Sequence, residues 1–213
     1  MSILDNIDEF LPKYLSEPSE YELKEQLSRF SSRGTENTIY TTALSHSDEL
    51  FQGDGLSQIP FYDAVSQEVR PANVIVLSNS CDINLNNKRM ESINICVAPI
   101  LNLEKYEKRL LTKGYNKQQV ASHISDIKRQ VITHVIYLPK TEKMTYEAIV
   151  RLDKICSVDR NKVSNEDIQH NRLFTLSDFG LYLFLLKLSI HFTRIKERID
   201  RYKGEILPPI TPL

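Results

Sequence analysis

The stretch that most constrains the fold is residues 70–101, where two short apolar runs flank a polar segment. The runs are Ala72–Leu77 and Ile93–Ile100, and most of their apolar side chains are β-branched, which suits a pleated sheet packed on one or both faces. Both runs are too short for buried helices and are bounded by prolines or by Asn and Ser clusters. We therefore predict two paired strands joined by a polar loop, with Ser78–Asp82 as the first place to look for chemistry.

Helical spacing of apolar residues predicts helices on both sides of this pair. Residues 1–34 read as an N-terminal helical arm that packs on the core or on a partner. Segment 102–132 reads as a helical insertion of two helices broken at Gly114 and Asn116. The longest predicted helix is 176–203, and its apolar part is shorter than the ~20 residues that span a bilayer. A proline-rich extended tail, 204–213, follows it.

Further strands are predicted from β-branched and aromatic residues, and together with the helices they indicate an α+β protein. The segments are Thr35–Leu44, residues 134–139 and one or two strands within Tyr146–Val158. Gly53-Asp54-Gly55 marks a turn. Residues 35–203 are therefore expected to form one domain around the central pair.

Composition excludes several classes of function. The net charge of −1 provides no global basic field, so any nucleic-acid site must be a local patch. Cys81, Cys96 and Cys156 form no C-x-x-C pair, and the five histidines are scattered, so we expect neither a metal centre nor a cofactor. An odd number of cysteines in apolar surroundings and an acidic N-terminus unlike a signal peptide favour the cytoplasm and no membrane partner.

The first candidate site is Ser78-Asn79-Ser80-Cys81-Asp82. A hydroxyl, an amide, a thiol and a carboxylate at a strand end can bind a polar ligand or a phosphate. Cys81 would act as a nucleophile only where a neighbouring base or cation lowered its pKa. The alternative is a turn whose polar side chains bind their own backbone, with Cys81 filling a small apolar gap.

The second candidate site is the charged segment 151–160, which includes Lys154, Ser157, Asp159 and Arg160. Strand alternation would place Asp153, Ile155, Ser157 and Asp159 on one side. A cation and a carboxylate at such a position can stabilise charge and move a proton at a phosphodiester. The alternative is a solvated strand face without chemistry.

In their order along the chain, several short segments resemble the MazF/PemK/Kid family of toxins. These are Gly53-Asp54, Arg70-Pro71, Leu77-Ser78-Asn79, Ala98-Pro99-Ile100, the run Val150–Val163 beside the family's V-x-x-D-Q-I-R-T-I-D-K-x-R-L, and Leu173–Asp178 before the last helix. The resemblance covers roughly residues 49–192. It implies a partly open SH3-like β-barrel with a C-terminal helix, a homodimer, and single-stranded RNA in a groove near the dimer interface.

The resemblance also implies roles for individual residues. Arg70 and Lys154 would hold phosphate, Asp159 would serve as acid or base, and Ser78 and Ser157 would orient the substrate. Asn79, Cys81, Asp82 and Arg160 would contribute to RNA or ligand binding. Cleavage would need no metal, because the RNA 2′-hydroxyl is an internal nucleophile.

The chain departs from the family pattern at an important position. The catalytic arginine of the family falls on Cys156, and its threonine falls on Ser157. A thiol cannot make the bidentate phosphate contacts of a guanidinium. Segment 102–132 and the N-terminal arm have no counterpart in minimal toxins.

Two functions therefore stay open. One is a metal-independent endoribonuclease of a bacterial toxin–antitoxin or phage-defence system. The other is a catalytically inactive barrel that binds RNA, a protein such as an antitoxin or defence component, or a small ligand. A third, separate site at Cys81 and Asp82 is the remaining alternative.

Overall fold

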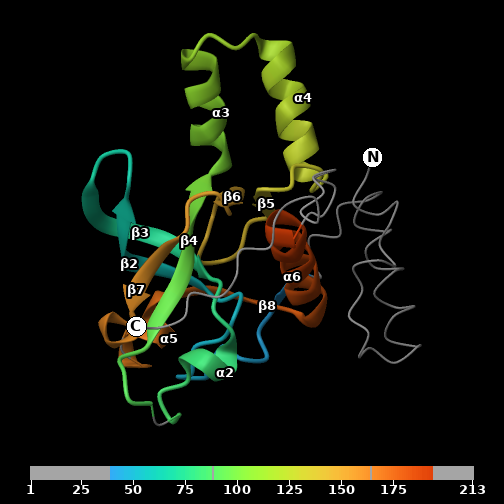
Figure 1. Cartoon of the computed structure of the whole chain (residues 1–213). Helices are drawn as coiled ribbons and strands as arrows, with labels where there is room; N and C mark the ends of the chain where they lie inside the picture. Colours follow the sequence, from blue (N-terminus) through green and yellow to red (C-terminus); the bar gives the residue numbers. More distant parts are fainter. Residues whose placement is uncertain (1–38, 88, 164, 194–213) are drawn as a thin grey trace, which may run out of the picture.

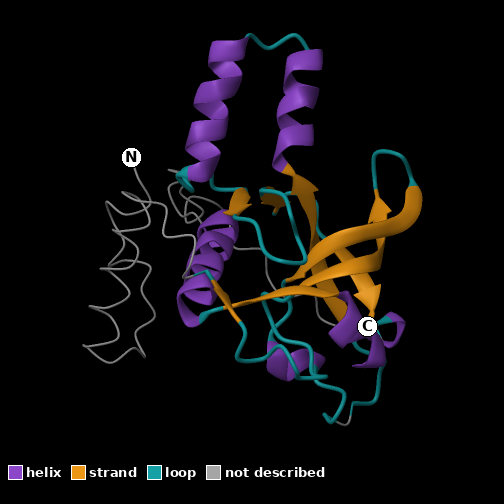
Figure 2. Cartoon of the chain, turned by 180° about the vertical axis from the view of Figure 1, so that it is seen from behind, coloured by secondary structure: helices purple, strands orange, loops and turns teal. Residues whose placement is uncertain are grey.

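A computed structural model describes residues 39–87, 89–163 and 165–193. Within these residues the protein is α+β, with an open antiparallel sheet of eight strands. Figures 1 and 2 show helices arranged around the sheet. The predicted arm at 1–34, the end of the predicted C-terminal helix and the tail at 204–213 lie outside the described residues.

Seven strands form a continuous path in the order β1-β8-β2-β3-β4-β6-β5, and β7 pairs with β4 beside that path. The strands are β1 (Tyr40–Thr41), β2 (Gly55–Asp63), β3 (Glu68–Val76), β4 (Asn94–Asn102), β5 (Val135–Leu138), β6 (Ala148–Arg151), β7 (Cys156–Asp159) and β8 (Arg172–Leu176). The helices are α2 (Ser80–Ile83), α3 (Leu103–Thr112), α4 (Lys117–Lys128), the 3₁₀ turn η3 (Arg160–Lys162), α5 (Asn165–Asn171) and α6 (Asp178–Thr193).

The predicted central pair is confirmed as β3 and β4. Val74 lies opposite Pro99, and Val76 lies opposite Val97. The other edge of β4 pairs with β7 near its start and with β6 near its end. This central strand therefore organises the sheet.

Three corrections follow from pairings between distant segments. The first correction is β2, which pairs with the edge of β3 that does not face β4 and which the local sequence pattern did not predict. The pairing of β2 with β3 is irregular between Leu56 and Ile59, where Gln58 has φ of 59°. The strand expected at Thr35–Leu44 is limited in the described residues to β1. Leu176, the expected start of the long helix, instead ends β8.

The sheet is covered on two faces, which explains why its central strands are continuously apolar. One core cluster includes Ile75, Ala98 and Val150 packed with Phe179 and Phe184 of α6. The second cluster lies on the other side of the same strands and includes Val74, Val76, Ile95, Val97, Ile83 and Val158. Neighbouring residues of β3 thus belong to different clusters.

Helix α6 approaches β1 closely at a glycine. Ser177 caps the helix, because its Oγ accepts from the Gly180 N–H at 3.1 Å, and its own N–H donates to the Ile39 carbonyl at 2.8 Å. A Cβ on Gly180 would lie 2.1 Å from that carbonyl oxygen.

No helix within the described residues is long and apolar enough to cross a membrane.

The predicted helical insertion is confirmed as the hairpin α3–α4, which projects from the sheet in Figure 1. Gly114 has φ of +93° in the connection, and Asn116 caps α4 through a reciprocal pair of bonds with Gln119. A third cluster, with Leu103 and Ile127 packed on β5 and β6, fixes the base of the hairpin.

Candidate functional site

The predicted segment Ser78–Asp82 forms the entry to α2, and most of its polar groups bind backbone. Asn79 Oδ1 accepts from the Cys81 N–H at 2.9 Å, and Ser78 Oγ accepts from the Cys96 N–H at 2.8 Å. The Cys81 thiol is exposed, and the exposed Asp82 carboxylate pairs with Arg89 at 3.0 Å. The segment therefore acts first as a helix cap and a brace for β4.

Strand β7 places part of the second candidate site next to Cys96, the residue of β4 that Ser78 contacts. Ser157 is exposed and lies opposite Cys96, and Asp159 lies opposite Asn94. Ser78 and Ser157 thus lie next to the same residue, Cys96, at the two opposite edges of β4. Asp159 Oδ1 accepts from the Asn161 N–H at 2.9 Å, so this carboxylate caps η3.

The expected alternation across residues 152–159 holds only in β7. Residues 152–155 form a turn between β6 and β7, and Leu152 is buried there. Lys154 and Asp153 thus lie in this turn and not on a continuous strand with Ser157 and Asp159.

Arg160 does not occupy the surface position that a phosphate contact requires. The residue is only 2% exposed, and its guanidinium donates to the backbone carbonyls of Ile83, at 3.3 Å, and Val163. The side chain joins α2 to the segment after η3. Its predicted role in RNA binding is corrected to a structural one, because water and ligands do not reach it.

Arg70 forms an ion pair with the Asp63 carboxylate, and the charge of Lys154, distant in sequence, also acts on that carboxylate. Arg70 Nη2 is 2.8 Å from Asp63 Oδ2 at the end of the β2–β3 hairpin. A hydrogen bond from the Val65 N–H lowers the pKa of Asp63, and the positive charges of Lys154 and Arg70 lower it further. The structure therefore brings together the two residues for which phosphate contacts were expected, beside an acidic neighbour that was not expected.

Cys156, the position at which the sequence resemblance would place the catalytic arginine of the toxins, faces the protein interior. Cys156 is half-buried against the second core cluster, and burial raises the pKa of its thiol. The Tyr62 N–H of β2 donates toward this sulfur, so β7 lies against β2 as well as β4.

No protein-family model and no curated protein matches this chain. The case for any function thus depends on the chain's own residues.

Sequence patterns did not point to Tyr62 or Asp63. Tyr62 is 48% exposed and follows the buried Phe61, which is the alternation of a half-buried strand. Had the alternation in Pro60–Asp63 been used to predict β2, it would have placed Tyr62 on the exposed face of that strand.

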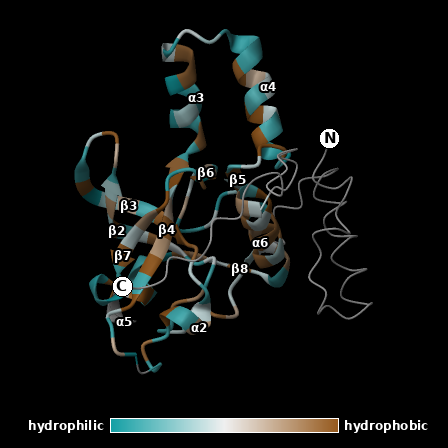
Figure 3. Ribbon diagram, viewed as in Figure 1, coloured by the Kyte–Doolittle hydropathy of each residue, from teal (hydrophilic) through white to brown (hydrophobic). Residues whose placement is uncertain are grey.

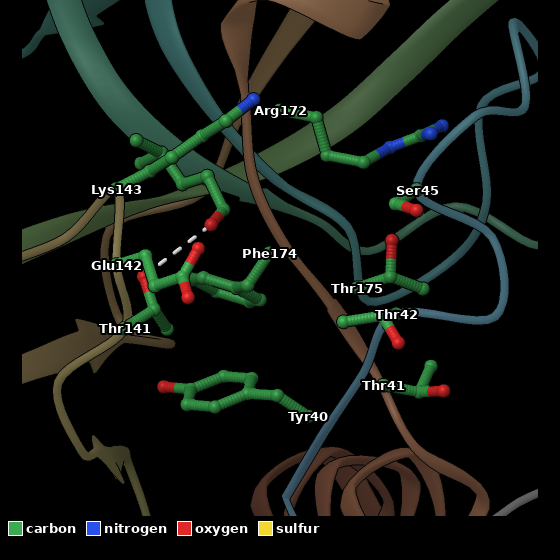
Figure 4. A pocket seen from close by; sticks show the side chains of 11 residues that line it. Tyr40, Thr41, Thr42, Ser45, Thr141, Glu142, Lys143, Arg172, Phe174 and Thr175 are labelled. Carbon is green, nitrogen blue, oxygen red and sulfur yellow. Dashed lines mark hydrogen bonds between the residues drawn. The ribbon is translucent and has the colours of Figure 1, made fainter.

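A separate cleft of about 520 Å³ lies between β1, β8 and the loop before β6, as Figure 4 shows. Its lining includes Tyr40, Phe174, Lys143 and Arg172. None of the predicted site residues lines it, and it has no part in the function proposed below. Within residues 39–193, apart from the two undescribed positions, no group of three or more His, Cys, Asp or Glu is arranged to hold a metal ion.

Proposed function

We propose that this protein is a divergent MazF/PemK-like barrel that binds single-stranded RNA. The binding surface comprises the end of the β2–β3 hairpin and the outer face of β7. The observation that carries the proposal is the ion pair between Arg70 and Asp63 next to the exposed ring of Tyr62, with Lys154 close enough for its charge to act on Asp63.

The strand arrangement supports a barrel of the SH3-like kind. Strands β2, β3, β4 and β7 are successive neighbours, and the Tyr62–Cys156 contact brings the last of them back to the first. Such closure encloses an apolar interior, and the second core cluster supplies side chains from each of these four strands. The long C-terminal helix α6 then covers the outside of the sheet.

The surface groups suit a flexible, negatively charged strand. Arg70 and Lys154 would contact phosphates, and the Tyr62 ring would stack on a base, a contact that does not depend on base identity. The hydroxyls of Ser78 and Ser157 would position sugars or phosphates nearby. Asp63 keeps the cations in place and lowers their net charge, so the expected affinity is modest.

The residues on this surface support RNA binding better than they support RNA cleavage by the mechanism that the toxin family uses. A neutral thiol stands where the family has an arginine, and the nearest alternative, Arg160, is buried on backbone carbonyls. Loss of such a charge-stabilising group typically costs ~10²–10³ in rate. A second candidate function, RNA cleavage without metal, is favoured by the half-exposed carboxylate of Asp159 beside Ser157.

The test is direct. A fluorescent single-stranded RNA is titrated with the wild type and with Arg70→Ala/Lys154→Ala, and anisotropy is recorded. The matched control is Arg129→Ala/Lys140→Ala, which removes the same charges from exposed positions outside this surface. We expect weaker binding only for the first variant. Equal affinity of all three proteins would refute the proposed surface.

The same RNA, made longer, decides between binding and cleavage. It is incubated with wild type and Asp159→Ala, with and without EDTA, and resolved on a gel. We expect intact RNA in every lane. EDTA-resistant cleavage that Asp159→Ala abolishes would replace the binding function by the endoribonuclease, whereas absence of both cleavage and binding would favour a protein-binding module.

A further inference from the structure

The distal half of the α3–α4 hairpin is a basic element on a chain of net charge −1. From Lys108 through Ser125, with both ends included, there are four lysines or arginines and no aspartate or glutamate. The acidic residues of the hairpin, Glu104, Glu107 and Asp126, lie at its base. Figure 3 shows the hairpin as largely hydrophilic and standing away from the apolar strands.

An aromatic pocket lies between the two helices in this basic half. It has a volume of about 390 Å³. Its lining residues are Tyr106, Leu110, Tyr115, Gln119, Val120 and His123. This volume is within the range of small-molecule sites. The pocket therefore has room for one planar base.

The rings that line the pocket are held in position by specific contacts. Tyr106 Oη and His123 Nε2 are 3.0 Å apart, and the two ring centroids are 5.9 Å apart. The Arg109 guanidinium lies 5.3 Å from the centroid of the Tyr106 ring. Tyr115, in the connection between the helices, is 54% exposed. A ring entering the pocket would meet preformed aromatic surfaces on both helices.

We propose that the α3–α4 hairpin is a second contact site for single-stranded RNA, and that its pocket accepts one unpaired base. The base stacks on Tyr106 or Tyr115, while Arg109, Lys113 and Lys117 contact the flanking phosphates. An acidic peptide would satisfy these cations but would leave the aromatic pocket without a matching planar group. This inference rests on the proposed function and adds to it a site on a different element.

The hairpin and β7 lie at opposite ends of β4, so an RNA that contacts both would run along this strand. Helix α3 follows β4 directly, and β4 pairs at its start with β7. The hairpin base is fixed to β5 and β6 by the third core cluster, and Lys128 Nζ binds both carboxylate oxygens of Glu147 at 2.8 and 2.9 Å. The basic tip is therefore held on the sheet by a fixed base.

The first experiment measures RNA affinity of charge variants by anisotropy. Lys113→Glu/Lys117→Glu changes the tip, and Lys140→Glu/Lys143→Glu makes the same charge change at exposed positions before β6. We expect roughly tenfold or greater weakening for the tip variant and about twofold or less for the control. Equal weakening of both would show a general charge effect and overturn the proposal.

The second experiment reports on the pocket itself. Single-stranded RNA containing 2-aminopurine loses fluorescence when that base stacks on an aromatic ring. We expect the wild type and Tyr115→Phe to quench it and Tyr115→Ala to quench it less, with unchanged far-ultraviolet circular dichroism. Full quenching by Tyr115→Ala/Tyr106→Ala would overturn the pocket as the base site. Competition by polyglutamate as strong as by RNA of equal charge would overturn the RNA assignment in favour of an acidic protein.

The two sites fail in distinguishable ways. If Arg70→Ala/Lys154→Ala weakens binding and the tip variant does not, the further inference is wrong and the proposed surface stands. If only Lys113→Glu/Lys117→Glu weakens binding, the α3–α4 contact site is upheld. The proposed surface at the end of the β2–β3 hairpin and on β7, called the β2–β7 surface below, is then wrong. Photo-crosslinking with 4-thiouridine RNA, followed by peptide mapping, assigns each contact to residues 106–123 or to the β2–β7 surface.

Discussion

Arg172 and Asp54 form an ion pair of 3.2 Å in which both side chains are buried. The Asp54 carboxylate also accepts hydrogen bonds from Thr175 Oγ1 at 2.8 Å and from the Phe51 N–H at 3.0 Å. Arg172 donates in turn to the backbone carbonyls of Leu44, Ser47 and Glu49. This network attaches the loop before β2 to β8.

Removing one partner of this pair is predicted to destabilise the protein strongly. Arg172→Met would leave the Asp54 charge buried without its cation, at a cost of about 3–5 kcal/mol in the free energy of unfolding. Urea denaturation of wild type, Arg172→Met, Asp54→Asn and the double variant measures this. We expect the double variant to lose less than the sum of the singles, because the two residues form a unit. Single variants within about 1 kcal/mol of wild type would contradict the argument.

Lys187 is predicted to make stability depend on pH. Its Nζ is buried in α6 and donates to the carbonyls of Gln130 at 2.8 Å and Ile132 at 2.6 Å. Burial lowers the pKa of Lys187 to about 7. Between that pH and the ordinary lysine pKa, the unfolded chain binds more protons than the folded protein, so the free energy of unfolding rises with pH, by up to ~1.4 kcal/mol per unit.

The measurement is urea denaturation between pH 6 and 10. In Lys187→Met, the free energy of unfolding should no longer rise with pH above pH 7. In Lys105→Met, a change at an exposed position, it should rise as in the wild type. Burial lowers the pKa of His134, whose charge interacts with that of Lys187, so His134 does not cause a rise above pH 7. A variant Lys187→Met that retains the full rise would show that another group causes it.

A side chain at Gly180 is predicted to separate α6 from β1. The Cβ of alanine would overlap the Ile39 carbonyl, which is backbone and cannot rotate away. Overpacking of this kind costs about 1–3 kcal/mol. Thermal unfolding of Gly180→Ala tests this, with Gly114→Ala as the comparison, where no atom lies within 4 Å but φ is positive. We expect the larger loss at Gly180.

RNA binding is predicted to weaken with salt, and Arg70 and Lys154 should account for part of the slope. Each phosphate contact releases counterions, so removal of one contact lowers the slope of log affinity against log salt by about 0.7 for a single strand. Anisotropy titrations at several salt concentrations compare wild type, Arg70→Ala and Lys154→Ala. An unchanged slope would show that these residues touch no phosphate.

Local pattern was enough to predict the elements whose signal lies within one segment. The β-branched runs that became β3 and β4 and the helical spacing of α3 and α4 were recognised in the sequence. The capping residues Asn116 and Ser177 act as their residue types predict. In each case the residues that determine the structure are neighbours in the chain.

Other features depended on segments that meet only in the folded protein. β8 pairs with β1 and with β2, so its residues looked like the start of a helix until those partners were known. The burial of Arg160 depends on carbonyls of α2 and of the residues after η3. Its charge alone suggested a surface role.

The sequence by itself determined the central β3–β4 pair, the helical hairpin and the candidate residues, because periodicity and residue type are local properties. Only the tertiary structure decided which candidates share a surface. It placed Arg70 and Lys154 around Asp63, turned Cys156 inward and buried Arg160, because strand pairing and core packing over long sequence distances set each side chain's direction and exposure.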